Sequence, residues 1–358
     1  MITTLRGQLA RLFTATCLSA MMCTPLQAQD VVEGTAYFLP RTAIHYALLI
    51  ERTTTQPGEL CMYADRFLKK KDVAFQPSTS YRILSITSFC TGIRDTAKHY
   101  VAAIDQKHSI QSLKVNDDGI IAAVNGDARP VAQHRPFEPA PKPEPLNPRD
   151  FMNQDILTAG SSAKTAELAA QEIYDIRDSR NQLSRGQADQ MPKDGEQLRL
   201  MMANLDTQER ALLQLFEGTT ERDTTEVIVT FVPEKEVQKH LLFRFSKRLG
   251  LVDADDLSGA PCYVSVEDLH SMPANSAVAD EGKRGKDDAN IFVTMPGKIR
   301  VRLFNMQKEL ATQELYAAQF GKSAPLDNEL FGKKLFTRLV YNTITGSVES
   351  INTDMIKK

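Results

Sequence analysis

The main constraint on this fold is a change in hydrophobic period near the middle of the chain. Between Phe151 and Gly218 apolar residues recur every three or four positions, as on the buried face of an α-helix. On either side they alternate with polar residues, which is typical of strands. We therefore expect an α+β fold, in which a long antiparallel helical hairpin separates two β-rich units built as sandwich-like antiparallel sheets.

The helical part divides into two apolar runs. These are Ala166, Ala169, Ile173, Ile176 and Leu183 in the first run, and Leu198, Met202, Leu205, Leu212 and Phe216 in the second. Gly186, Pro192 and Gly195 interrupt the helical pattern between them, and Gly218 ends the second run. This pattern predicts two helices that run side by side in opposite directions.

Four charged residues fall on or next to the apolar stripes of these helices. In the stretch IYDIRDSRNQL, Arg177 and Arg180 share a stripe with isoleucines, and Glu209 occupies a core position of the second run. An unpaired charge buried between helices is strongly destabilising. We predict an Arg177–Glu209 ion pair, with Arg180 reaching Asp206 or a carbonyl of the β units. The alternative is that the two arginines bind an anionic ligand.

The flanking segments supply the strands. A Pro296-Gly297 turn is expected to divide one of them into a hairpin, and Thr345-Gly346 to close a second hairpin. Apolar residues at helical spacing predict a short helix within Gly58–Leu68. Strands are expected at residues 43–53, 80–90, 120–124, 225–233, 239–246, 261–268, 290–305, 314–320 and 336–351.

The first residues read as an export signal. Arg6 and Arg11 precede a short apolar run, Leu12–Cys23, that is too short to span a bilayer. The sequence therefore predicts a signal peptide over residues 1–28. The expected location is the periplasm, the outer membrane or the cell surface, with no transmembrane segment in the mature chain.

The rest of the chain divides by composition into four parts. Six prolines between Pro136 and Pro148 favour an extended, semi-rigid linker. Its simplest role is a spacer, and the alternative is a ligand for a proline-binding groove. The expected parts are an N-terminal β-rich domain (29–130), the Pro-rich linker (131–148), the helical hairpin (149–220) and a C-terminal β-rich domain (221–358).

Removal of the signal peptide takes out two of the five cysteines. An odd number of remaining thiols allows one internal disulfide at most. Cys61 and Cys90 are the local candidates for that bond, while the simpler interpretation is that the cysteines are small buried hydrophobic residues. There is no CxxC spacing, so neither a redox pair nor a zinc site is predicted.

No local motif assigns a catalytic residue, a cofactor or a metal. The six histidines form no HxxxH, HExxH or HxH pattern, and GxSxG, GxGxxG and GxxxxGK[ST] are absent from the sequence. His270 follows Glu267 and Asp268, and we expect this cluster to be a strand end in water. Asp253–Asp256 is expected to be a turn. A formal net charge of −2 argues against a nucleic-acid partner.

Four segments resemble a known family. They are YFLPRTAIHYALLIERTTTQPGELCMYADRFL (37–68), ELAAQEIYDIRDSRNQLSRGQADQMPKDGEQLRLMMANLDTQERALLQLFEGTT (167–220), AAQFGKSAPLDNELF (317–331) and TRLVYNTITGSVESI (337–351). The mature chain is similar along most of its length to exported proteins of Bacteroidota grouped as domain of unknown function 4831. The resemblance implies export, and it carries over no activity, cofactor or catalytic residue.

The sequence thus predicts an exported cell-envelope protein that acts by binding or assembly and is not an enzyme. Its partner is expected to be another envelope protein or a glycan. The alternative is a periplasmic hydrolase or carbohydrate-active protein whose catalytic residues are dispersed along the chain.

Overall fold

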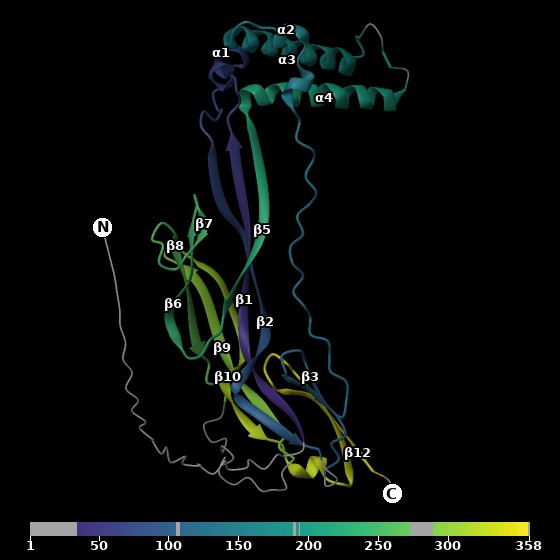
Figure 1. Cartoon of the computed structure of the whole chain (residues 1–358), viewed down its shortest axis with the longest axis vertical. Helices are drawn as coiled ribbons and strands as arrows, with labels where there is room; N and C mark the ends of the chain where they lie inside the picture. The colour runs from purple at the N-terminus through teal and green to yellow at the C-terminus, as the bar shows by residue number, and fades with distance from the viewer. Residues whose placement is uncertain (1–33, 105–107, 189–190, 193, 273–288, 357–358) are drawn as a thin grey trace, which may run out of the picture.

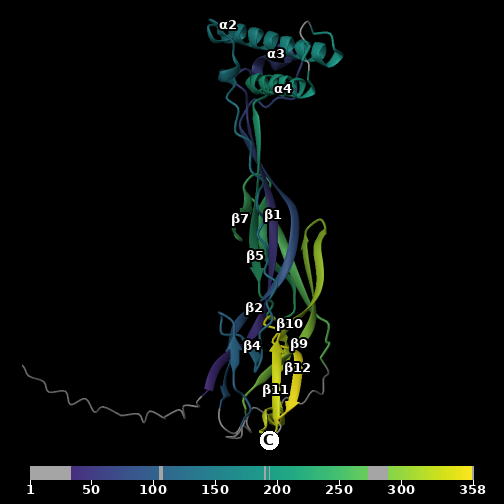
Figure 2. The same ribbon diagram turned by 90° about the vertical axis from the view of Figure 1, so that its right-hand side faces the viewer.

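The computed structural model describes residues 34–104, 108–188, 191–192, 194–272 and 289–356. The molecule is elongated, with helices gathered at one end of a long three-stranded sheet and further sheets around its other end (Figures 1 and 2). The predicted signal peptide lies outside the described residues. Within the described ranges, no helix has the length and apolar character needed to cross a bilayer.

The long sheet has the strand order β2–β1–β5, and all its pairs are antiparallel. Its strands are β1 (Gly34–Gln56), β2 (Ser78–Ala103) and β5 (Thr219–Phe231). At about 3.3 Å per residue, the 23 residues of β1 extend roughly 75 Å. We call the upper part of this sheet, from Glu51 of β1 toward the helices, the stalk.

Two more antiparallel sheets form the base, which is the end of the molecule opposite the helices. A five-stranded sheet has the order β10–β9–β8–β6–β7, and a four-stranded sheet has the order β12–β11–β4–β3. Their strands are β3 (Leu113–Val115), β4 (Ile121–Val124), β6 (Val237–Ser246), β7 (Gly250–Val252), β8 (Ala260–Asp268), β9 (Phe292–Asn305), β10 (Glu309–Pro325), β11 (Leu335–Tyr341) and β12 (Val348–Met355). A short 3-10 helix, η3 (Asn328–Phe331), lies between β10 and β11.

Strands from both ends of the sequence share two of these sheets. β5 follows the helices in sequence but pairs with β1, and β11 pairs with β4. The expectation of two separate β-rich domains, residues 29–130 and 221–358, is therefore wrong. Alternating hydrophobicity identifies a strand and its buried face, but the choice of partner strand depends on contacts that are distant in sequence.

A large hydrophobic core lies between the long sheet and the five-stranded sheet. The long sheet contributes buried side chains at every second position of β1, including Ile44, Tyr46 and Leu48. Facing residues of the five-stranded sheet include Val264 and Val301. A second core joins the start of β1 to the four-stranded sheet and the start of β9. One strand, β1, therefore contributes to both cores.

Strand β9 runs without interruption through Pro296 and Gly297, so the predicted turn at this dipeptide is wrong. Across the sheet, Gly297 pairs with Ala317 and Met295 pairs with Lys322, which leaves extra residues in β10 opposite Pro296. Such a bulge tolerates a proline, which cannot donate to the strand ladder. A Cβ on Gly297 would lie 2.2 Å from the carbonyl oxygen of Phe320. The dipeptide marks a bulge, and β9 turns into β10 only after Asn305.

The head comprises the helices at the far end of the stalk. It contains η1 (Cys61–Tyr63), α1 (Ala64–Leu68), η2 (Pro148–Phe151), α2 (Gln154–Leu157), α3 (Ser162–Arg185) and α4 (Gly195–Glu217). The short helix predicted within 58–68 is confirmed by η1 and α1. Side-chain oxygens of Ser161 and Asp194 accept backbone N–H bonds at the starts of α3 and α4, and left-handed Gly186 ends α3.

The helices α3 and α4 lie side by side in the head (Figure 1). Ala166, Ala169 and Ala170 are buried on α3 and let the helices approach closely, while Leu212 and Phe216 fill the facing side of α4. The small helices also contribute to this third core, for example through the buried side chains of Leu60, Ala64 and Ile156.

The proline-rich segment, residues 131–147, runs beside the stalk from the base to the head (Figure 1). We call it the strap. Near the base, Glu226 of β5 accepts hydrogen bonds from the backbone N–H of Phe137 and lies 2.9 Å from His134 Nε2. Farther up, Lys142 pairs with Asp223 of β5, which also binds Arg52 of β1 at 2.8 Å. The linker is therefore attached to the sheet along its course.

Two glycines make the junction between head and stalk. Gly218, which connects α4 to β5, has a φ of +76° and a ψ of −160°, a conformation open essentially to glycine alone. A Cβ there would lie 1.9 Å from the carbonyl oxygen of Gln56 at the end of β1. Gly58 approaches α4 in the same way, 2.2 Å from the carbonyl oxygen of Leu215. Backbone thus packs directly on backbone where the head begins.

The first prediction concerns this junction. Replacing Gly218 by alanine should lower the free energy of unfolding by about 3 kcal/mol, because both the backbone conformation and the contact with β1 become strained. Urea denaturation followed by far-ultraviolet circular dichroism measures the change. Gly195→Ala is the control, since this glycine begins α4 and nothing lies near its absent Cβ. An equal loss of unfolding free energy in both variants would contradict the special requirement for glycine at position 218.

Candidate functional site

The structure brings together the four charged residues of the helical head on which the sequence prediction rested. Arg177 Nε on α3 donates to Glu209 Oε1 on α4 at 2.6 Å. Arg180 Nη1 donates to Asp206 Oδ1 at 2.6 Å and lies 2.8 Å from Glu209 Oε2. The Glu209 side chain is only 9% exposed. Its charge therefore lies in a largely buried place, where both of its oxygens contact guanidinium groups.

This cluster is satisfied within the protein. Both carboxylate oxygens of Glu209 face arginines, and the guanidinium of Arg177 also lies 5.7 Å from the ring centroid of Tyr174. The hydrogen bond to Asp206 and the charge of Glu209 raise the pKa of Arg180. Both arginines are already neutralised by carboxylates, which disfavours an anionic ligand at this place. The cluster holds α3 to α4.

The candidate disulfide between Cys61 and Cys90 does not form. Cys61 lies in η1 of the head, whereas Cys90 lies on β2 opposite Ile44, and both are free thiols. Cys90 is separated from the head by the length of β2 above it, roughly 40 Å, and a disulfide needs Cα atoms within about 7 Å. Burial raises the pKa of the Cys90 thiol. It also raises the pKa of the Cys262 thiol, to about 11. Both thiols therefore favour the protonated, unreactive form.

Among the described residues, no three histidine, cysteine, aspartate or glutamate side chains are placed to hold an ion together. His270 Nδ1 lies 3.4 Å from Asp268, and its side chain is 81% exposed. Within the stretch 253–256, Asp256 accepts the backbone N–H of Ser258, which lowers its pKa and forms the expected turn.

The strap is attached to the sheet by an aromatic stack that the sequence did not indicate. The ring of Phe89 on β2 stacks with His45 of β1, at a centroid distance of 4.8 Å, and with His134 of the strap, at 4.3 Å. The two ring nitrogens of His45 contact the hydroxyls of Thr230 and Thr91 at 2.9 and 2.7 Å. Burial and the nearby His134 lower the pKa of His45.

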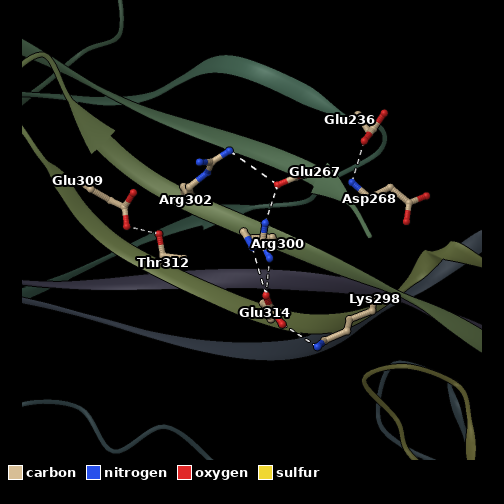
Figure 3. Close-up of polar contacts among 9 residues, drawn as sticks. All are labelled: Glu236, Glu267, Asp268, Lys298, Arg300, Arg302, Glu309, Thr312 and Glu314. Atoms are coloured by element: carbon tan, nitrogen blue, oxygen red, sulfur yellow. Dashed lines mark hydrogen bonds and ion pairs between the residues drawn. The ribbon is translucent and has the colours of Figure 1, made fainter. Parts of the chain in front are cut away.

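The outer face of the five-stranded sheet carries a row of paired charges (Figure 3). Arg300 of β9 lies in register with Glu267 of β8 and Glu314 of β10. Its guanidinium binds Glu314 at 2.9 Å and Glu267 at 3.1 Å, and Lys298 binds Glu314 at 2.6 Å. Hydrogen bonds from Lys298 and Arg300 lower the pKa of Glu314. Opposite charges on neighbouring strands fix the register of this face.

An open cleft of about 880 Å³ adjoins this row of charges. It is formed by the start of β6, the outer faces of β8 and β9, and the turn between β9 and β10. Its lining residues are Glu236, Val237, Gln238, Ser265, Val266, Glu267, Arg302, Phe304, Asn305, Met306, Gln307, Lys308 and Glu309. The volume is in the range of small-molecule sites. We regard this cleft as the candidate functional site.

Hydrogen-bonding groups of both kinds face the cleft. Arg302 Nη2 lies 3.8 Å from Glu267 Oε2, which is an ion pair beyond hydrogen-bonding distance. Glu236 accepts the backbone N–H of Asp268 at 2.8 Å, and Glu309 accepts the hydroxyl of Thr312 (Figure 3). The cleft can therefore bind a polar ligand through several donors and acceptors.

An aromatic edge completes the cleft. The ring of Phe304, in the lining, lies 5.8 Å from that of Tyr263 on β8, and Lys239 Nζ lies 4.3 Å from the Tyr263 centroid. The sequence contained a signal for this face, because Lys298, Arg300, Arg302 and Phe304 alternate along β9. Placing a turn at Pro296-Gly297 obscured it, and the convergence of β6 with the β9–β10 turn is not visible in any local pattern.

The second prediction tests the ion cluster of the head. Glu209→Ala should lower the free energy of unfolding by about 3 kcal/mol, because two arginines lose their partner in a partly buried site. A double-mutant cycle with Arg177→Ala should give a coupling energy of at least about 1 kcal/mol in urea denaturation. The exposed Glu196–Arg199 pair on α4 is the control and should show no measurable coupling. Equal coupling energies in both pairs would contradict the proposal that the cluster around Glu209 holds α3 to α4.

The third prediction concerns pH. Since the folded protein keeps His45 neutral below the ordinary value of 6.5, the unfolded chain binds more protons there. Stability should therefore be lost as the pH falls below 6.5 toward the lowered pKa. His45→Gln should flatten the fall in melting temperature between about pH 7.5 and pH 5.5, measured by scanning fluorimetry. His270→Gln, at an exposed site, should leave the slope unchanged; equal slopes in all three proteins would refute the prediction.

Comparison with known proteins places this chain in a family. No curated protein and no solved structure matches the chain. The family described as domain of unknown function DUF4831 matches residues 33–349, which include the strands that line the cleft, the strap and the whole head. The chain therefore belongs to the DUF4831 family.

Proposed function

We propose that this chain is an exported cell-envelope protein that acts by binding or assembly. The observation that carries the proposal is the separation of two differently built regions by one continuous sheet (Figures 1 and 2). A helical head lies at one end of the stalk, and a polar cleft lies on the base at the other end. A spacer between two contact regions suits a protein that connects partners.

The arrangement of the elements fits this role. In our proposal the long sheet and the five-stranded sheet form a sandwich-like base, supported by the core that both sheets share. The helices α3 and α4 form an antiparallel hairpin, supported by the ion cluster around Glu209 and by their common core. The hairpin presents exposed apolar side chains, including Leu200 and Met201 on α4.

The stalk is suited to hold the head at a fixed distance. From Glu51 to Gln56, β1 has no apolar side chain, and cross-strand polar pairs hold the sheet instead. Arg82 binds Glu51 at 2.8 Å, and Arg52 binds Asp223 at 2.8 Å. The strap adds contacts along this polar sheet. Such a structure needs no burial against another layer and can stand free in solvent.

Export is supported by the N-terminal pattern. Arg6 and Arg11 followed by a short apolar run are typical of a secretory signal, with processing expected after residue 28. We propose the periplasm, the outer membrane or the cell surface as the location, and an envelope protein or a glycan as the partner.

The fourth prediction tests binding at both ends in the native cell. A photoreactive amino acid at Leu200 of the head or Met306 of the cleft should give cross-links to an envelope component, because both side chains are exposed. The same group at Ser80, on the stalk, is the control and should give few. Cross-linked products are identified by mass spectrometry after cell fractionation. Unprocessed chain in the cytosol, or no cross-links from either end, would overturn the proposal.

A further inference from the structure

The lining of the cleft indicates the chemistry of its ligand. Uncharged polar side chains are prominent in it, namely Gln238, Ser265, Asn305 and Gln307. The lining also contains carboxylates and cations, so both hydrogen-bond donors and acceptors face one space. A ligand with many hydroxyl groups matches this surface, since each hydroxyl can both donate and accept.

The charges of the cleft nearly cancel. The lining contains three negative charges, from Glu236, Glu267 and Glu309. They are balanced by the positive charges of Arg302 and Lys308 in the lining and of Lys239 beside it. A ligand with a strong net charge of either sign would meet like charges next to its partners. The electrostatics therefore favour a neutral ligand.

An aromatic side chain gives the cleft an apolar surface. The half-buried ring of Phe304 is supported by Tyr263, with Lys239 over the Tyr263 ring. The C–H face of a sugar ring packs on such an aromatic surface while its hydroxyls point outward to polar groups. The exposed Met306 adds a flexible apolar contact at the edge of the cleft.

The position of the cleft disfavours an extended peptide. Peptides that bind as an added strand need a free sheet edge. The cleft lies mainly on the face of β8 and β9, which both have neighbouring strands on each side. It reaches the edge of the sheet only at the start of β6, since β7 pairs with β6 from Arg244 to Ser246 alone. Recognition over β8 and β9 must use side chains, which suits a compact polyhydroxylated ligand.

We infer that this cleft on the outer face of the five-stranded sheet binds a neutral oligosaccharide. The inference rests on the proposed binding function and names the ligand class of the base end. Phe304 is the platform for one sugar ring, and the amides of Gln238 and Gln307 contact hydroxyl groups around it. The row of paired charges beside the cleft keeps the strands that carry these residues in register.

The fifth prediction tests the ligand by isothermal titration calorimetry of the purified mature chain. The probes are maltohexaose, cellohexaose, mannohexaose and xylohexaose, with polygalacturonate as the anionic comparison. At least one neutral hexasaccharide should bind with a micromolar to millimolar dissociation constant. Its affinity should change less than about twofold between low and high salt, because no charge is neutralised. Binding of polygalacturonate alone, weakened by salt, would overturn the inference.

Matched variants locate the site. Phe304→Ala should weaken binding at least tenfold, and Gln307→Ala, at an exposed turn position, about fivefold. Phe75→Ala is the control, because this phenylalanine is 57% exposed and lies outside the cleft. Unchanged melting temperatures show that the variants fold. If Phe304→Ala does not fold, Gln307→Ala still tests the site. Full affinity in both cleft variants would place the ligand elsewhere.

The two proposals fail separately. If no hexasaccharide binds while Met306 cross-links to an envelope protein, the inference about glycans is overturned and the binding function stands. If the sugars do not bind and neither end cross-links, both are overturned.

Discussion

Every part of this molecule depends on the pairing of β1 with its two neighbours. The strand pairs with β2 from Gly34 to Thr55 and with β5 from Ile44 to Gln56. Its first residues contribute to the core of the four-stranded sheet, its middle residues face the five-stranded sheet, and its last residues reach the head. The buried hydroxyl of Tyr37 accepts the backbone N–H of Phe292 and donates to the carbonyl of Asn290, which attaches β9 to the start of β1.

The side chains of β1 change as its surroundings change. Where the strand lies against the base, alternate residues are apolar and buried, and one face of the sheet is fixed by the core. Beyond Ile50, β1 itself has no apolar side chain, and a strand that is polar on both faces specifies its register weakly. Ion pairs, glycines at the junction and the attached strap supply the missing specificity there. The prolines of the strap let it lie against the sheet without adding another strand.

The sequence was sufficient to predict what is local. The helices of the head, the short helix after Gly58, the terminal hairpin and the contact between Arg177 and Glu209 all follow from periodicity along one or two neighbouring segments. Of the two partners expected for Arg180, Asp206 and a carbonyl of the β units, the structure shows Asp206.

Contacts between segments that are distant in sequence could not be predicted from local periodicity. The exchange of strands between the two β-rich ranges, the stacking of His134 on Phe89 and the cleft all need the folded chain. The Pro296-Gly297 dipeptide was ambiguous as a sequence signal, because proline followed by glycine suits both a tight turn and a bulge within a long strand. Two cysteines close in sequence were separated because β2 carries one of them far down the sheet.

The direct packing of Gly58 and Gly218 against backbone has a mechanical consequence. It joins the head closely to β1 and β5, so a pull on the head acts along the axes of these two strands, whereas β2 is connected through residues 69–77, which form no helix or strand. The hydrogen bonds of the sheet lie across that direction and are loaded together in shear, whereas a free hairpin end would open one bond at a time. This geometry resists lengthening of the molecule under tension.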